Sequence, residues 1–101
     1  MTGNGEPDAS RAGLTDALTR LHAALADSIG PGQTAQVREY IEHHEFGLAL
    51  ELIIAFLIQH RLRGRPFEAD IAFLAAAMGM EDSLHVAEWR KHLGEAPPPI
   101  A

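Results

Sequence analysis

One segment, residues 46–58, constrains the fold of this chain more than any other. It reads FGLALELIIAFLI and carries a single charged residue, Glu51. A membrane-spanning helix needs about 20 apolar residues, so a run of this length predicts a buried helix instead. A helix that is apolar nearly all round is stable only when neighbouring elements cover it on several sides. The sequence therefore predicts a central helix over residues 45–60, enclosed by other helices.

Four further helices are predicted from apolar residues that recur mostly at steps of three and four. The stripes are Leu14, Leu18, Leu21, Leu25 and Ile29 in the first helix (residues 10–28), Val37, Tyr40 and Ile41 in the second, Phe67, Ile71, Leu74 and Met78 in the fourth, and Leu84, Val86, Trp89 and Leu93 in the fifth. Strict alternation of apolar and polar residues is absent, so no strand is predicted. The expected fold class is all-α, a compact bundle of about five helices around the apolar central helix.

Caps and helix breakers set the predicted ends of these helices. The residues expected there are Gly30, Pro31 and Gly32 after the first helix, Thr34 before the second, Pro66 at the start of the fourth, Gly79 after it, Asp82 or Ser83 before the fifth, and Gly94 after it. The predicted organisation is a disordered tail over residues 1–9, one helical domain over residues 10–94 and a Pro-rich tail over residues 95–101.

Charge and composition narrow the classes of function. Fourteen acidic against eight basic side chains give a net charge of −6, which repels nucleic acid and favours a basic partner. The absence of cysteine excludes disulfides, thiolate metal sites and a cysteine nucleophile. The first ten residues lack the basic and apolar regions of a signal peptide, so a cytoplasmic protein without membrane association is expected. The oligomeric state stays open.

Polar residues at the end of the second helix form the candidate site. Glu39, Glu42 and Glu45 follow at three-residue steps, which keeps them within reach of one another, and His43 and His44 lie between them. Adjacent histidines diverge by about 100° around a helix, unlike the pair in H-E-x-x-H metal sites, so no metal or cofactor is expected. No catalytic residues are predicted, and enzymatic activity is not expected. A solvated acidic face and a face that contacts a partner remain two interpretations.

A DNA-binding regulator is the alternative function. Residues 75–80 read AAAMGM and precede further apolar positions, which is the spacing of a helix-turn-helix formed by the fourth and fifth helices. A recognition helix exposes basic and amide side chains, however, whereas Glu81 and Asp82 are acidic and only Arg90 and Lys91 oppose them near the far end. Two helices joined by a glycine turn are also common in bundles without DNA-binding function.

Residues 37–51 read VREYIEHHEFGLALE and resemble the signature of the MafI-type family of bacterial immunity proteins. That signature consists of a short helix, a His or Gly, then Glu, an aromatic residue, Gly-Leu-Ala and Leu-Glu. Weaker similarity extends over residues 14–80. The resemblance implies a small helical protein that is encoded beside a polymorphic toxin and that binds and neutralises this toxin, often a nuclease.

An acidic immunity protein can occlude the basic active site of such a nuclease, so the charge of the chain and the resemblance indicate the same residues. The expected toxin contacts are Glu39, Glu42, His43, His44 and Glu45, and the expected structural residues of the motif are Phe46, Gly47 and Glu51. Glycine inside a helix costs about 1 kcal/mol relative to alanine, so close packing is expected at Gly47. The basic link over residues 61–65, or the fifth helix, remains an alternative contact surface.

Overall fold

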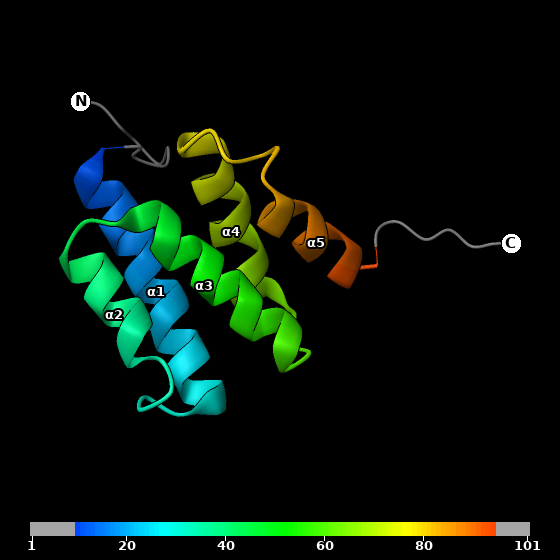
Figure 1. The fold of residues 1–101 in the computed structure, drawn as a ribbon, viewed down its shortest axis with the longest axis horizontal. Coiled ribbons are helices and arrows are strands. Elements are labelled where there is room, and N and C mark those ends of the chain that lie inside the picture. Colours follow the sequence, from blue (N-terminus) through cyan, green and yellow to red (C-terminus); the bar gives the residue numbers. More distant parts are fainter. Residues whose placement is uncertain (1–9, 95–101) are drawn as a thin grey trace, which may run out of the picture.

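Five α-helices and no strand make up the part of the chain described by a computed structural model, residues 10–94 (Figure 1). They are α1 (Arg11–Ile29), α2 (Ala35–Glu42), α3 (Phe46–Gln59), α4 (Arg65–Ala77) and α5 (Leu84–His92). This confirms the predicted all-α bundle. None of these helices combines the length and apolarity required to cross a membrane. The tails predicted over residues 1–9 and 95–101 lie outside the described residues.

Helix α1 buries its leucine stripe against three other helices. Leu18, Leu21 and Leu25 are fully buried, and α1 packs on α2, α3 and α4. The helix begins where the Ser10 hydroxyl accepts a hydrogen bond from the amide of Gly13 at 3.3 Å. Helix α1 is therefore a second central element of the bundle, beside the one that the apolar run predicted.

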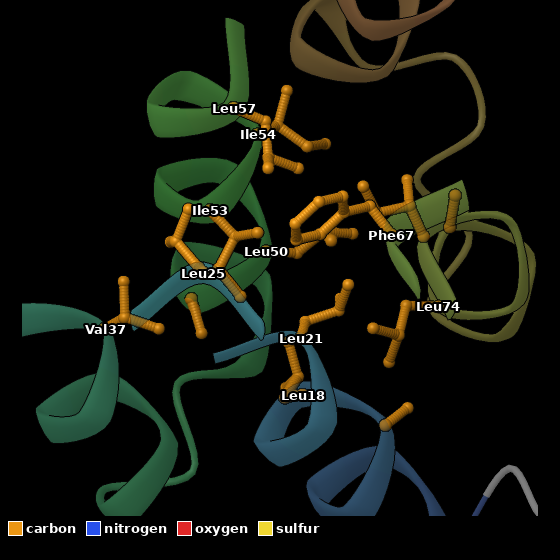
Figure 2. Packing of buried hydrophobic residues seen from close by; sticks show 14 of the residues in the cluster. Leu18, Leu21, Leu25, Val37, Leu50, Ile53, Ile54, Leu57, Phe67 and Leu74 are labelled. Carbon is orange, nitrogen blue, oxygen red and sulfur yellow. The ribbon is translucent and has the colours of Figure 1, made fainter. Parts of the chain in front are cut away.

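Helix α3 lies between α2 and α5 and also packs on α1, which confirms its predicted central position (Figure 1). The core side chains shown in Figure 2 are Leu18, Leu21 and Leu25 from α1, Val37 from α2, Leu50, Ile53, Ile54 and Leu57 from α3, and Phe67 and Leu74 from α4. The cover is incomplete, because Leu48 on the outer side of α3 is 47% exposed. The central helix thus presents an apolar strip to solvent.

Helices α4 and α5 are attached to different partners. Helix α4 packs on α1, where the Arg20 guanidinium donates hydrogen bonds of 3.1 and 2.9 Å to the Asp70 carboxylate. These hydrogen bonds raise the pKa of Arg20 above its ordinary value. Helix α5 packs on α3 and buries Val86 and Trp89 in the core. The two helices are still neighbours, because side chains such as Ala75 of α4 and Trp89 of α5 line one shared hollow.

The start of α5 corrects one sequence prediction and resolves another. Leu84, predicted as an apolar contact, is 71% exposed. It lies about 200° around the helix from Val86, which points into the core, so it must face solvent. Ser83 rather than Asp82 caps the helix, because its hydroxyl accepts a hydrogen bond from the Val86 amide at 3.2 Å.

Thr34 stands at the predicted start of α2 but does not cap it with its side chain. Its backbone has φ −104° and ψ 12°, which is not the extended conformation that directs an N-cap hydroxyl at the helix amides. The buried hydroxyl instead donates to the Pro31 carbonyl at 3.2 Å and lies 3.0 Å from Nε2 of His22. These bonds satisfy a buried polar group and join α1 to the start of α2.

Neighbouring residues of α3 provide a matched test of this core. Ile53 is fully buried, whereas Leu52 is half-buried. We expect Ile53→Asp to abolish cooperative thermal unfolding, because an unpaired buried carboxylate removes several kcal/mol from a total stability of roughly 5–15 kcal/mol. Leu52→Asp should still melt cooperatively, at a lower temperature. Circular dichroism melting measures both, and a near-wild-type melt of Ile53→Asp would contradict the described core.

Candidate functional site

The residues predicted to contact a partner lie where α2 ends and α3 begins. Glu39 and Glu42 are on α2, His43 and His44 follow its end, and Glu45 occupies the N-cap position of α3. All five side chains are exposed. We call these five residues the acidic corner.

Left-handed backbone at His44 forms this corner. His44 has φ 59°. Its amide donates a hydrogen bond to the Ile41 carbonyl at 3.0 Å, and the Glu45 amide donates one to the Tyr40 carbonyl at 2.8 Å. This pair of bonds is the Schellman motif, in which the left-handed residue is usually glycine. Arg61 (φ 58°) ends α3 in the same way. Neither left-handed conformation was predicted from the sequence, because neither residue is a glycine or an asparagine.

Only weak internal contacts hold the carboxylates of the acidic corner. Glu42 lies 3.9 Å from Arg38 in a pair whose side chains are 64% and 66% exposed, and such pairs contribute little. Glu39 accepts a long hydrogen bond of 3.4 Å from Gln36. The Glu45 side chain accepts no capping hydrogen bond from α3. These carboxylates can therefore pair with external cations without breaking a strong internal interaction.

The acidic corner faces in two directions. Glu42 and His44 line a hollow between α1 and α2, together with Arg38. Tyr40, on the opposite side of α2, faces α3. Around the helix axis Glu39 lies about 100° from Tyr40, and Glu42 about 160°. Glu39 is therefore the α2 carboxylate closer to the α3 side.

A metal site is not formed by the histidines of the corner. Nδ1 of His43 lies 2.9 Å from the backbone carbonyl of Glu39, and the His44 ring packs 5.5 Å from the Phe46 ring. Among residues 10–94, no three His, Cys, Asp or Glu side chains are grouped so as to hold a metal ion.

The three motif residues at the start of α3 have different surroundings. Phe46 is half-buried and packs against the core. A Cβ added at Gly47 would lie 3.7 Å from Sδ of Met80, an ordinary van der Waals distance, so the packing leaves room for alanine there. Glu51 is half-buried, and its Oε2 lies 3.7 Å from Nδ1 of His85 on α5.

A groove over the outer side of α3 was not predicted from the sequence. It measures about 200 Å³, and its lining residues are Tyr40 from α2, Leu48, Glu51, Leu52 and Ala55 from α3, and His85 from α5. No lysine or arginine lines it. We call these six residues the α3 groove. An apolar floor with a carboxylate in its wall can accommodate an apolar group that has a cation beside it.

The basic link and the end of α5 meet at the other end of α3. Nη1 of Arg63 donates to the His92 carbonyl at 3.0 Å, and Nε2 of His92 lies 2.8 Å from the Leu62 carbonyl. The exposed basic residues gathered there are Arg61, Arg63, Arg90 and Lys91, which we call the basic end. The two alternative surfaces of the sequence analysis are thus one surface. The 14 residues of α3 separate it from the acidic corner by roughly 20 Å.

The geometry of α4 and α5 bears on the helix-turn-helix alternative. Residues 78–83 connect the two helices, whereas a helix-turn-helix has a turn of about three or four residues. Glu81, Asp82 and Glu88 are exposed around the first half of α5, and its exposed basic residues stand in the last turn. A DNA major groove would therefore meet carboxylates where a recognition helix usually reads bases.

Comparisons with protein-family models, with curated proteins and with solved structures gave no match for this chain.

Left-handed residues at the helix ends predict which substitutions stabilise the protein. We expect Arg61→Gly to raise the free energy of unfolding by about 1 kcal/mol, because glycine adopts positive φ without strain. His44→Gly should gain less, since it also loses the ring contact with Phe46. Ala55→Gly, at an exposed position inside α3, should instead lower stability by about 0.5–1 kcal/mol. Urea unfolding measures all three, and destabilisation by Arg61→Gly would show that the turn is wrongly described.

Proposed function

We propose that this chain is an immunity protein that binds and neutralises a cognate bacterial toxin, with the acidic corner as part of the contact surface. The observation that carries the proposal is the exposure of the corner: its carboxylates face solvent, and within residues 10–94 one weak ion pair, from Glu42 to Arg38, involves them. Charged groups arranged in this way attract and orient a partner of opposite charge.

The resemblance to the MafI-type signature supports the same location. The matching residues from His44 to Glu51 comprise two members of the acidic corner, His44 and Glu45, and the first six residues of α3. The signature allows His or Gly at the position of His44, and here that residue has the left-handed conformation that glycine adopts most easily. A requirement of the backbone therefore accounts for one variable position of the motif.

The proposed mechanism is occlusion. A nuclease domain holds phosphates with basic residues, so a protein with net charge −6 complements it and is steered towards it. Once bound, the bundle covers the basic surface and prevents nucleic acid from entering. The chain performs no reaction of its own in this proposal, and it acts in the cytoplasm, where the toxin would reach nucleic acid.

DNA binding predicts a different behaviour, which a simple titration separates from the proposal. An immunity protein with this charge should show no association with duplex DNA at physiological ionic strength, because it lacks the basic surface that releases counterions. Fluorescence anisotropy of a labelled duplex across a salt series measures this. Nanomolar binding to one duplex would favour the helix-turn-helix alternative over the immunity function.

Charge reversal at the acidic corner tests the proposal directly. We expect the double variant Glu39→Lys, Glu42→Lys to associate with the toxin encoded next to this chain at least about tenfold more slowly at low salt. The loss should shrink as salt rises and screens the wild-type attraction. Glu39 should account for more of it, because Glu42 is paired with Arg38. Binding kinetics across a salt series and protection during co-expression are the measurements.

The control variant Asp27→Lys, Glu88→Lys makes the same charge change on exposed residues of α1 and α5. It should slow association less than the corner variant. Glu45→Lys needs its own melting curve, since a carboxylate at the start of α3 also stabilises the helix N-terminus. Full protection and unchanged kinetics in a folded corner variant would exclude the acidic corner and direct attention to the basic end.

A further inference from the structure

We infer that the α3 groove is the anchor site of the toxin interface. It seats one aliphatic or aromatic side chain of the toxin, and a lysine or arginine beside that side chain pairs with Glu51. The inference rests on the proposed function and adds the chemistry of the partner: a basic surface segment with one protruding apolar residue.

The shape of the groove supports an anchor of this kind. Its floor is the outer strip of α3, formed by Leu48, Leu52 and Ala55, and its walls are Tyr40 and His85. Leu48 and Leu84 are the exposed large apolar residues of the described chain, and Leu48 is the one that lines this groove. Binding hot spots are commonly pockets in which one side chain becomes fully desolvated.

The charge of the groove favours a lysine or arginine of the toxin next to the anchored side chain. The Glu51 side chain is 34% exposed, and its one ion-pair partner among the described residues, His85 at 3.7 Å, is charged only when protonated. With no lysine or arginine in the lining, a cation from outside meets no repulsion from a permanent positive charge. A carboxylate in a partly desolvated wall interacts more strongly with such a cation than one in open solvent.

Continuity with Glu39 and Glu45 joins this part of the acidic corner and the groove into one surface. Glu45 precedes Leu48 by three residues, so both lie on the same side of α3 near its first turn. Tyr40 follows Glu39 on α2 and lines the groove, and its carbonyl accepts a hydrogen bond from the Glu45 amide. The arrangement is an apolar centre with carboxylates along one side, the usual anatomy of a protein interface.

Two matched pairs of variants test the anchor site. Leu48→Ala removes apolar surface from the groove, and Leu84→Ala removes the same groups from an exposed position outside it. Ala55→Arg fills the groove from an exposed helical position without removing a core contact, and Gln59→Arg adds the same charge on α3 outside the groove. Because Ala55→Arg adds to an exposed site, its result stays interpretable even if Leu48→Ala proves less stable.

The probe is the purified C-terminal domain of the toxin encoded beside this chain, inactivated at its catalytic residue. We expect Leu48→Ala and Ala55→Arg each to raise Kd at least about 30-fold, mainly through faster dissociation. The loss in Leu48→Ala, which changes no charge, should depend little on salt. Leu84→Ala and Gln59→Arg should stay within about threefold of wild type. Circular dichroism melting confirms that all four variants are folded.

The outcomes separate this inference from the proposed function. If the groove variants bind like wild type while the Glu39→Lys, Glu42→Lys variant binds more slowly, the anchor site is wrong and the immunity function stands. If the groove variants lose affinity and their matched controls do not, the inference is supported. If the wild-type protein does not bind the toxin domain at all, the proposed function fails and the anchor site fails with it.

Discussion

Burial of α3 against α1 is the interaction on which the rest of the structure depends. A helix of 14 residues is marginal in water on its own, and α3 is too apolar to remain exposed. The stripe that contains Leu21 and Leu25 meets the face that contains Leu50 and Ile53, and these side chains are fully buried. The remaining helices then cover what this pair leaves open: α2 and α5 lie along α3, and α4 lies along α1.

The same constraint explains why a functional surface remains on the central helix. Helices α1, α2 and α5 cover most of α3. Between α2 and α5, Tyr40 and His85 flank the outer side of α3, and the strip at Leu48 stays open to solvent. Among residues 10–94 no further helix covers this gap. A partner protein would complete the burial that the fold leaves unfinished, which links the stability of the bundle to its proposed function.

The two ends of α3 carry surfaces of opposite charge. The acidic corner stands at its first turn, and the basic end is fixed at its last turn by the bonds from Arg63 and His92. A basic partner would be attracted to one end and repelled from the other, which favours approach to the side where the α3 groove begins. The charge distribution and the apolar surface therefore favour the same orientation of the proposed complex.

Local patterns in the sequence determined the helices, the stop at Gly79 and the burial of Trp89, and they narrowed the cap of α5 to Asp82 or Ser83, because each depends on residues within a few positions of one another. Tertiary structure alone decided that Leu48 is exposed and that the two basic segments meet. The period of a helix shows which side chains share a face, but the crossing of helices distant in sequence decides which faces are covered. The acidic corner was accessible to sequence reasoning, whereas the α3 groove, built from three helices, was not.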